Sequence, residues 1–340
     1  MRVLVTGGAG FIGSHFARRL AAAGDEVVVL DKLTYAGNLA NLESVSGEPR
    51  FRFVQGDIGD TAAVETALPG CQAVVNFAAE THVDRSILEP DAFVKTDVLG
   101  TWTLVEAARK AGIERFLHVS TDEVYGAVLS GASVESDRLE PSSPYSASKA
   151  GGEMLVLAAF KTFQLPALVV RGANAYGPFQ YPEKLIPLHI TNAIDDQALP
   201  VYGDGQQRRQ WTHVADFARG VDVVLRTGEV GEIYNIGDPA PESDIPVNLE
   251  VSRRILATLG KPASLLQHVV DRPAHDRRYR VDAARLLSLS WQPAWSFERG
   301  LEATVRWYVD NERWWRPIKR GEHHRTYYAQ NYADRSVFAR

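Results

Sequence analysis

Short apolar runs alternate with longer amphipathic stretches through the first half of the chain. The runs have the length of buried strands, whereas the longer stretches carry apolar residues at helical spacing. The pattern predicts strands at residues 2–6, 26–31, 51–55, 73–77, 115–120 and 167–171. It predicts helices at residues 13–23, 62–68, 91–111 and 145–163. Strands that alternate with helices indicate an α/β fold with a parallel, doubly wound sheet.

The pattern changes after Arg171, where residues 172–187 and 239–246 are rich in Gly, Pro and polar residues. Helices are predicted at 213–227, 248–259 and 297–311, and a strand at 232–235 that we expect to return to the main sheet. We therefore predict a sheet domain of residues 1–173 and 212–238. A smaller, interleaved domain would comprise residues 174–211 and 239–320. Residues 321–340 have no clear period and are expected to form a tail with a mobile end.

Composition narrows the classes of function. The chain has 340 residues and a net charge of −5 without a dense Lys/Arg run, so we expect no nucleic-acid partner. Its single cysteine excludes internal disulfides and indicates a reducing compartment. The apolar run at the N-terminus is too short for a signal sequence or a membrane span, which predicts a cytoplasmic protein without a membrane partner. The histidines lack ligand spacing, so no metal site is expected.

A glycine-rich loop follows the first predicted strand and opens the first helix. Glycines at positions 7, 10 and 13 permit a tight turn, close approach of the backbone to a pyrophosphate, and close helix–strand packing. Asp31 ends the second strand, where a carboxylate accepts from ribose hydroxyls and repels a 2′-phosphate. The loop therefore predicts a Rossmann-like NAD site, although Lys32 weakens the preference over NADP. The alternative is a structural glycine turn without a ligand.

Two further strand ends point to the same edge of the sheet. Asp57 and Ile58 follow the third strand and are expected to contact adenine through a carboxylate and an apolar side chain. The segment Ala78-Ala79-Glu80 ends the fourth strand, where small residues let the backbone approach a cofactor. Asp57 alone could equally be a solvated loop residue.

Tyr145 and Lys149 are four residues apart on a predicted helix and so share one face. Ser143 is a candidate N-cap and Pro144 a first helical residue. A cation about 4 Å from a phenol is worth about 4 kcal/mol at an effective dielectric constant of about 20, or roughly three pKa units. We therefore expect Lys149, with the positive nicotinamide ring, to lower the pKa of Tyr145 toward neutrality. The alternative is a surface pair.

Thr121, Asp122 and Glu123 follow the predicted strand 115–120 and so reach the same edge. The Thr121 hydroxyl can bond a substrate oxygen near the phenol. Oxidation of an alcohol needs no pair of carboxyl groups, so a proton donor and acceptor here suggest elimination as well as hydride transfer. Solvated acids at a helix start are the alternative.

Together these motifs resemble the dTDP-glucose 4,6-dehydratases of the extended short-chain dehydrogenase/reductase superfamily. The resemblance covers about residues 1–318, and the block 120–126 is its most diagnostic part. It runs through residues 7–13, 31–38, 81–86, 120–126, 145–149, 176–178, 182–187, 202–205 and 275–279.

The resemblance implies NAD-dependent conversion of dTDP-glucose to dTDP-4-keto-6-deoxy-glucose. Tyr145 would take the 4-hydroxyl proton while hydride leaves C4. Glu123 would remove the C5 proton while Asp122 protonates the departing 6-hydroxyl, and hydride would return to C6. These roles require the environments of the two carboxyl groups to separate their pKa values.

The resemblance also assigns the site residues. The catalytic set is Thr121, Asp122, Glu123, Tyr145 and Lys149. The cofactor set is Gly7, Gly10, Phe11, Ile12, Gly13, Asp31, Lys32, Thr34, Asp57, Ile58, Ala78, Ala79, Glu80, Thr96, Tyr145 and Lys149. The substrate set is Thr81, Thr121, Asn174, Lys184, Leu185, Pro200, Tyr202, Arg209, Asn248, Arg272 and His275. In this set Lys184, Arg209 and Arg272 suit a diphosphate, and Tyr202 suits a pyrimidine base.

Two positions depart from the family pattern. Ala175 stands where a second asparagine is usual, and Ala274 stands where glycine is usual. We expect them to affect cofactor affinity and the fit of the sugar nucleotide, not the reaction class.

The resemblance further implies a homodimer, formed when helices 91–111 and 145–163 of two chains pack as a four-helix bundle. Two other functions remain open. A sugar-nucleotide 4-epimerase or decarboxylase of the same superfamily would share the glycine loop, Tyr145 and Lys149, but typically lacks the Asp-Glu pair after Thr121. A non-catalytic NAD-binding regulator would be expected to lack Tyr145 or Lys149.

Overall fold

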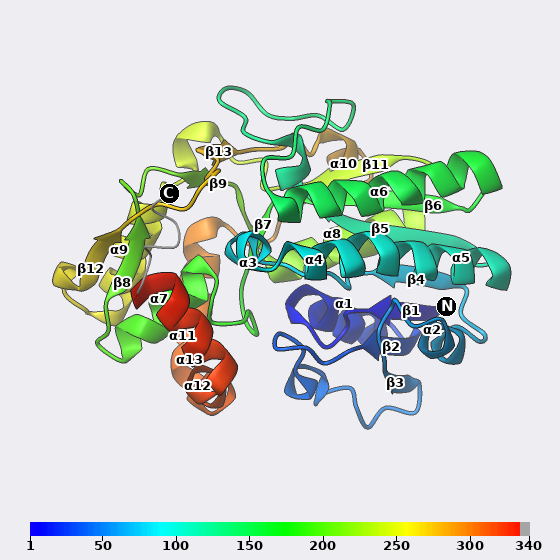
Figure 1. Ribbon diagram of the computed structural model, residues 1–340, viewed down its shortest axis with the longest axis horizontal. Helices are drawn as coiled ribbons and strands as arrows, with labels where there is room; N and C mark the ends of the chain where they lie inside the picture. The colour runs from blue at the N-terminus through cyan, green and yellow to red at the C-terminus, as the bar shows by residue number, and fades with distance from the viewer. Residues whose placement is uncertain (334–340) are drawn as a thin grey trace.

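The computed structural model describes residues 1–333 and has a parallel sheet of seven strands in the order β11-β6-β5-β4-β1-β2-β3 (Figure 1). All seven predicted strands are confirmed to within one residue at each end, and β11 pairs with β6, as expected. The strands are β1 Arg2–Thr6, β2 Glu26–Asp31, β3 Phe51–Gln55, β4 Ala73–Asn76, β5 Arg115–Thr121, β6 Ala167–Gly172 and β11 Ile233–Ile236.

The strand order reverses between β1 and β4. From β1 the chain adds β2 and then β3 on one side, and it then crosses back to add β4, β5 and β6 on the other. Connections leave the carboxyl edge in opposite directions at such a reversal and open a crevice there. The glycine loop follows β1 and Ala78 follows β4, so both lie at this crevice.

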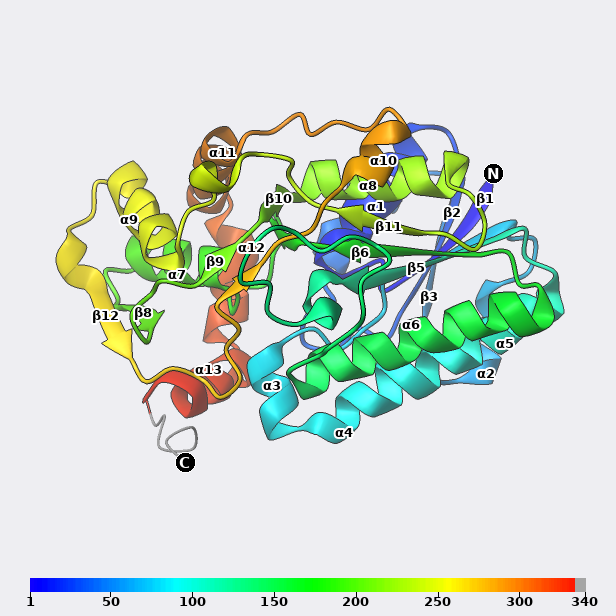
Figure 2. The same ribbon diagram turned by 90° about the horizontal axis from the view of Figure 1, so that it is seen from above.

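Helices cover both faces of the sheet, as Figure 2 shows from above. One face carries α1 (Phe11–Ala22), α8 (Val214–Thr227) and α10 (Ala284–Ser288). The other carries α2 (Thr61–Ala67), α5 (Thr101–Ala111) and α6 (Pro144–Phe163). The two-sided cover explains why the strands are apolar throughout instead of alternating.

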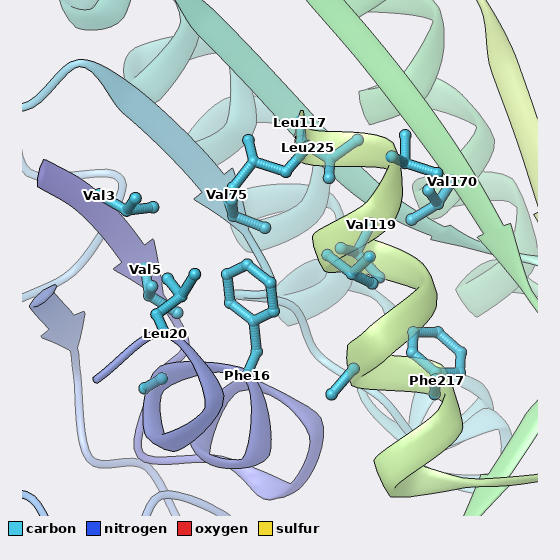
Figure 3. Close-up of a cluster of buried hydrophobic side chains, with 14 of the residues drawn as sticks. Val3, Val5, Phe16, Leu20, Val75, Leu117, Val119, Val170, Phe217 and Leu225 are labelled. Atoms are coloured by element: carbon cyan, nitrogen blue, oxygen red, sulfur yellow. The ribbon is translucent and has the colours of Figure 1, made fainter. Parts of the chain in front are cut away.

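The core lies between the sheet and these two helix layers. Val3 and Val5 of β1 pack with Phe16 of α1, as Figure 3 shows, whereas Leu4 packs on the opposite face. Phe217 of α8 joins the first cluster. Successive residues of one strand thus serve two cores, which fixes the register of the sheet.

The predicted helix 91–111 is present but is interrupted by a wider turn. The chain runs from α3 (Val83–Leu88) into α4 (Pro90–Phe93), then through the π-helical η2 (Val94–Gly100) into α5. The widened turn turns Asp97 inward, where it is 2% exposed. Short π-helical segments of this kind frequently occur at functional sites.

The remaining elements build a smaller region beside the carboxyl edge of the sheet (Figure 1). Its core joins Tyr176, Trp211, Phe297 and Trp315 to apolar residues of its helices. Three short parallel pairs link β7 to β10, β8 to β12 and β9 to β13. The strands are β7 Asn174–Tyr176, β8 Leu199–Tyr202, β9 Arg208–Arg209, β10 Trp211–His213, β12 Leu266–Val269 and β13 Arg278–Tyr279. The α-helices are α7 Leu185–Ile194, α9 Asn248–Leu259, α11 Phe297–Asp310, α12 Glu312–Arg320 and α13 Glu322–Tyr328. The other turns are η1 Leu39–Leu42, η3 Asp122–Tyr125, η4 Glu242–Asp244, η5 Ala263–Leu265 and η6 Ala329–Ala333.

The expectation of a tail at residues 321–340 is wrong for the part that the structure describes. Helix α13 and the π-helical η6 pack back onto the protein and bury His324, Tyr327 and Asn331. Their side chains contact several different elements instead of one apolar face, so no helical period marks them in the sequence. Residues 334–340 lie outside the described residues.

A buried ion pair joins α6 to the sheet. The Arg171 guanidinium donates from Nη2 to Oε1 of Glu153 at 2.5 Å and from Nη1 to the Tyr125 hydroxyl at 2.7 Å. The side chains of Arg171 and Glu153 are 3% and 0% exposed. Loss of one partner would leave a buried charge without its counter-charge.

We predict that Glu153→Ala lowers the free energy of unfolding by about 3–5 kcal/mol, because it leaves the Arg171 charge buried and unpaired. Urea unfolding followed by circular dichroism measures the change. Glu65→Ala, on the exposed side of α2, is the matched control and should change stability by at most about 0.5 kcal/mol. Equal losses in the two variants would contradict the prediction.

Candidate active site

The loop between β1 and α1 brings main chain close to main chain. Gly7 has a φ of +67°, and a Cβ there would lie 2.7 Å from the Ala78 nitrogen. A Cβ on Gly13 would lie 2.3 Å from the Gly7 oxygen. Gly10, the residue before α1, supplies no side-chain cap, so the first turn keeps main-chain N–H groups for an anion. This cradle fits the pyrophosphate of a dinucleotide.

Asp31, at the end of β2, holds the loop that carries it. Its carboxylate accepts from the main-chain N–H groups of Ala9 at 2.9 Å and Leu33 at 2.8 Å. Burial raises the pKa of Asp31, and these N–H groups oppose the rise. Lys32 pairs with Asp57 at 2.7 Å. The Lys32 charge is therefore balanced within the protein, which reduces its attraction for a 2′-phosphate.

One cavity is lined by every residue of the predicted cofactor set and by the five predicted catalytic residues. A second cavity is lined by nine residues of the predicted substrate set, and Thr81 and Thr121 line the first. The two cavities share six lining residues: Glu123, Asn174, Ala175, Gln180, Glu183 and Lys184. The structure thus brings the whole predicted set together around two adjoining spaces.

Tyr145 is positioned by the start of α6. Ser143 caps this helix and forms a reciprocal capping box with Ser146, and Pro144 occupies the first turn. Lys149, one turn along, is buried, and its ammonium donates to the Val119 carbonyl at 2.8 Å. Burial lowers the pKa of Lys149.

The expected lowering of the Tyr145 pKa is not found in the protein alone. Burial, and then the Glu123 charge, raise the pKa of Tyr145, while a hydrogen bond with Thr121 opposes the rise. The spacing puts Lys149 on the right face, but its ammonium is bound to a carbonyl and the phenol faces carboxylates. The spacing of Tyr145 and Lys149 along the chain could not predict that Glu123, Asp97 and Asp122 surround the phenol.

Asp122 lies in η3, directly after β5, and is 3% exposed. The Thr121 hydroxyl donates to its Oδ1 at 3.2 Å. Burial and the neighbouring Glu123 charge raise the pKa of Asp122 to about 8. Asp122 therefore keeps its proton at neutral pH and can act as a proton donor.

Asp97 is a buried acid beside the first cavity that the sequence analysis missed; it contacts Glu80, which lines that cavity. Its Oδ2 accepts from the Ser148 hydroxyl at 2.7 Å and its Oδ1 accepts from the Glu80 N–H at 3.0 Å. Burial raises the pKa of Asp97 to about 6, and the charge of Lys149 opposes the rise. In the sequence Asp97 is one polar residue within a long helical pattern, and only the π-helical turn directs it inward.

The second cavity is rich in cationic groups and in buried polar atoms. Arg209 lies 4.3 Å from the Tyr279 ring centroid, and Arg272 pairs with Asp84 at 2.9 Å. Within the described part of the chain, five residues that line this cavity have a buried atom without a hydrogen-bond partner: Oδ1 of Asn174, Oε1 of Gln180, Nε1 of Trp211, Oδ1 of Asn248 and Nε of Arg272. The amide oxygens suit ligand groups that donate hydrogen bonds. The N–H groups of Trp211 and Arg272 suit ligand groups that accept them, and the guanidinium charge suits an anion.

Further residues line the second cavity outside the predicted set. Asp84 and Glu183 lie within stretches that carry the family resemblance, so their positions were visible but their roles were not. Gln180 and Tyr332 also line this cavity, but the sequence around them contains no motif that would predict a binding role; it shows only polar residues and several aromatic ones.

The two departures from the family pattern have different surroundings. Ala274 has a φ of +50°, a left-handed conformation that favours glycine and costs alanine about 1–2 kcal/mol. The Ala175 carbonyl accepts from Gln180 Nε2 at 3.0 Å. The alanine at position 274 therefore carries backbone strain next to His275.

Residues 1–333 contain no group of three or more His, Cys, Asp or Glu side chains arranged to hold a metal ion. In the same range, none of the helices is both long and apolar enough to cross a membrane.

Comparisons with known proteins identify close relatives. A family model described as GDP-mannose 4,6 dehydratase matches residues 4–304. The dTDP-glucose 4,6-dehydratase of Streptomyces niveus is 48% identical over 326 residues, which cover 94% of this chain and 96% of the relative. The crystal structure of dTDP-glucose 4,6-dehydratase from Streptomyces venezuelae with NAD bound has a TM-score of 0.91 and 50% identity, covering 94% of this chain and 100% of the other. A UDP-glucose 4-epimerase from Thermus thermophilus with NAD has a TM-score of 0.85 and 30% identity, with 92% and 100% covered.

The raised pKa of Asp122 predicts how stability changes with pH. Between pH 6 and 8 the Asp122 carboxyl holds a proton in the folded protein that it has lost in the unfolded chain. Its contribution to the free energy of unfolding therefore falls by about 1.4 kcal/mol for each unit by which the pH rises. Asp122→Asn removes this dependence. The stability difference between wild type and variant should therefore shift by about 2–3 kcal/mol between urea unfolding at pH 6 and at pH 8.

The exposed Asp310 gives the matched control, because Asp310→Asn should leave the pH dependence of wild type unchanged. If the free energy of unfolding changed with pH in the same way for wild type and Asp122→Asn, Asp122 would not be held protonated in the folded protein.

Proposed function

The chain belongs to the dTDP-glucose 4,6-dehydratase family, and we propose that the residues gathered between its two cavities carry out the reaction of that family. That reaction is the NAD-dependent dehydration of dTDP-glucose to dTDP-4-keto-6-deoxy-glucose, so the chain is a hydro-lyase. The observation that carries the assignment of roles is the buried, protonated Asp122 beside Glu123 in the cavity that also contains Tyr145.

The proton transfers are divided among three side chains in this proposal. Tyr145 accepts the proton of the 4-hydroxyl, and Thr121 holds the oxygen in place. Glu123 removes the C5 proton, which the 4-ketone acidifies. Asp122, which enters the reaction protonated, gives its proton to the 6-hydroxyl as water leaves. In the elimination, the proton gained by Glu123 balances the one lost by Asp122. Glu123 then returns a proton to C5 as hydride reaches C6, and over the whole cycle the proton that Tyr145 takes from the 4-hydroxyl offsets the one that Asp122 loses.

The NAD site is proposed to use the glycine cradle for the pyrophosphate and Asp31 for the ribose hydroxyls. NAD supplies the hydride acceptor for C4, the hydride donor for C6 and, when oxidised, a positive charge in the cavity. Tyr145 requires such a charge, because burial and the neighbouring carboxylates raise its pKa in the protein alone.

The proposed division into domains follows the two cavities. Residues 1–173 and 212–238 would bind NAD, and residues 174–211 and 239–320 would bind the sugar nucleotide. We also propose a cytoplasmic location, which the single cysteine supports because it fits a reducing compartment.

We propose that the chain works as a homodimer through η2, α5 and α6. These helices run side by side in both views (Figures 1 and 2). They expose large apolar side chains: Val94 and Leu99 are 51% and 59% exposed, and Met154 and Phe163 are 44% and 46% exposed. Apolar residues clustered on one pair of helices favour burial against a partner.

Turnover in D2O tests the elimination. With dTDP-glucose, we expect a 4-keto-6-deoxy product with deuterium at C5, detected by NMR, because the hydrogen at C5 exchanges through Glu123. Unchanged sugar or a dTDP-galactose product would contradict dehydration.

Glu123→Gln is the matched variant. It should retain NAD yet stall after oxidation at C4, with product formation lower by at least about 100-fold, since it lacks the base for the next step. Normal turnover by this variant would show that another group removes the C5 proton.

The dimer is tested by charge insertion. The double variant Leu99→Arg, Met154→Arg should be a monomer by light scattering at micromolar concentration, because two buried cations would oppose association. Leu129→Arg, at a loop position that is 80% exposed, should leave the mass unchanged. A monomeric wild type would contradict the proposal.

A further inference from the structure

The glycine loop is fastened by the segment that follows β2. The Ala9 N–H donates to Oδ2 of Asp31 at 2.9 Å. The Ala9 carbonyl accepts from the Asn38 N–H at 3.0 Å and from Nδ2 of Asn41 at 2.9 Å. Ala9 is 0% exposed, so water does not compete for these bonds. They fix the main chain that leads into α1, whose first N–H groups are proposed to bind the pyrophosphate.

The Asn41 side chain is held in turn by α12, a helix of the smaller region. The Trp314 indole Nε1 donates to Oδ1 of Asn41 at 2.9 Å, across 273 residues of sequence. An indole N–H can only donate and a carbonyl can only accept, so the two partners together decide which end of the Asn41 amide faces Ala9. Two linked hydrogen bonds therefore run from α12 to the glycine loop.

Aromatic packing keeps α12 beside α1. The Phe179 ring lies 4.7 Å from the Trp307 ring and 5.6 Å from the Trp314 ring, between centroids. On α1, the Arg18 guanidinium lies 4.4 Å from the Phe179 centroid and the His15 ring lies 5.9 Å from it. Phe179 has a φ of +66°, a left-handed conformation that a non-glycine residue keeps only where its surroundings hold it. The rings thus place the Trp314 indole within reach of Asn41.

Packing alone does not account for the indole N–H, because a ring without it would pack against Phe179 and Trp307 as well. Asn41 is 1% exposed, so its Oδ1 would then be buried without a donor. The amide would lose one of the two contacts that orient it toward the Ala9 carbonyl. The cost of losing the indole N–H therefore falls on the glycine loop.

We propose that Trp314 and Asn41 are positioning residues for NAD, which act through the Ala9 main chain on the loop that holds the pyrophosphate. Neither side chain lines either cavity, so both govern NAD affinity and not the contacts with the sugar nucleotide. The NAD site thereby depends on a helix that lies beyond residue 304, where the family match ends. This dependence rests on the proposed NAD site at the glycine loop.

The experiment measures how fast the holoenzyme releases NAD, by exchange of bound NAD for excess isotope-labelled NAD. Trp314→Phe keeps a ring for packing but removes the N–H, so release should be about threefold to tenfold faster. Asn41→Leu keeps the approximate size and removes both hydrogen bonds, so release should be about tenfold to thirtyfold faster. The double variant should match Asn41→Leu to within about twofold, because the two residues act through one chain of bonds.

Trp315→Phe, at the next position of α12, is the matched control. It removes an indole N–H that donates to the Tyr308 carbonyl at 2.7 Å in the core of the smaller region. It should lower the free energy of unfolding in urea yet release NAD within about twofold of the wild-type rate. The Kd of Trp314→Phe for dTDP, measured by calorimetry, should also stay within about twofold of wild type, because Trp314 does not line the second cavity.

Three results would overturn the inference: release of NAD by Trp314→Phe at the wild-type rate, equal acceleration in Trp315→Phe, or effects of the two single variants that multiply in the double variant. If Asn41→Leu does not fold, the comparison of Trp314→Phe with Trp315→Phe decides alone. A wild type that holds no NAD would overturn the proposed NAD site itself. A wild type that holds NAD and converts dTDP-glucose confines any failure to this inference.

Discussion

The parallel register of the seven strands is the constraint on which the rest of the structure depends. Because all strands run in one direction, the residues that follow them meet at one edge, and the reversal between β1 and β4 opens a crevice there. Gly7, Asp31, Ala78 and Thr121, which are far apart in sequence, therefore line one cavity. The smaller region lies beside this edge, and its short strand pairs and helices supply the remaining walls of the two cavities.

Burial at that edge then sets the chemistry of the acids. The side chains of Asp122 and Asp84 are both almost fully buried, yet their pKa values shift in opposite directions. Asp122, beside another acid, has its pKa raised to about 8, whereas the guanidinium of Arg272 keeps Asp84 ionised. One group is thereby suited to give a proton and the other to hold cationic and hydroxyl groups in place.

The sequence predicted most of the fold because its signals were local. Each strand of the main sheet was found to within one residue, since buried parallel strands are short apolar runs between turns. The π-helical turn at Val94–Gly100 was missed because one extra residue in a turn leaves the apolar period nearly unchanged. The helices after residue 321 were missed because their aromatic side chains contact different elements, so they show no single face.

The candidate site divides in the same way between sequence and tertiary structure. The sequence by itself determined which residues reach the sheet edge and that Tyr145 and Lys149 share a helix face, because strand ends and helical spacing are local properties. Tertiary structure alone decided that Asp122 keeps its proton, that burial and the acids around Tyr145 outweigh the expected effect of Lys149, and that Asp97 and Asn331 turn inward. The physical reason is that charge states depend on burial and on neighbours distant in the chain, which no spacing along the chain encodes.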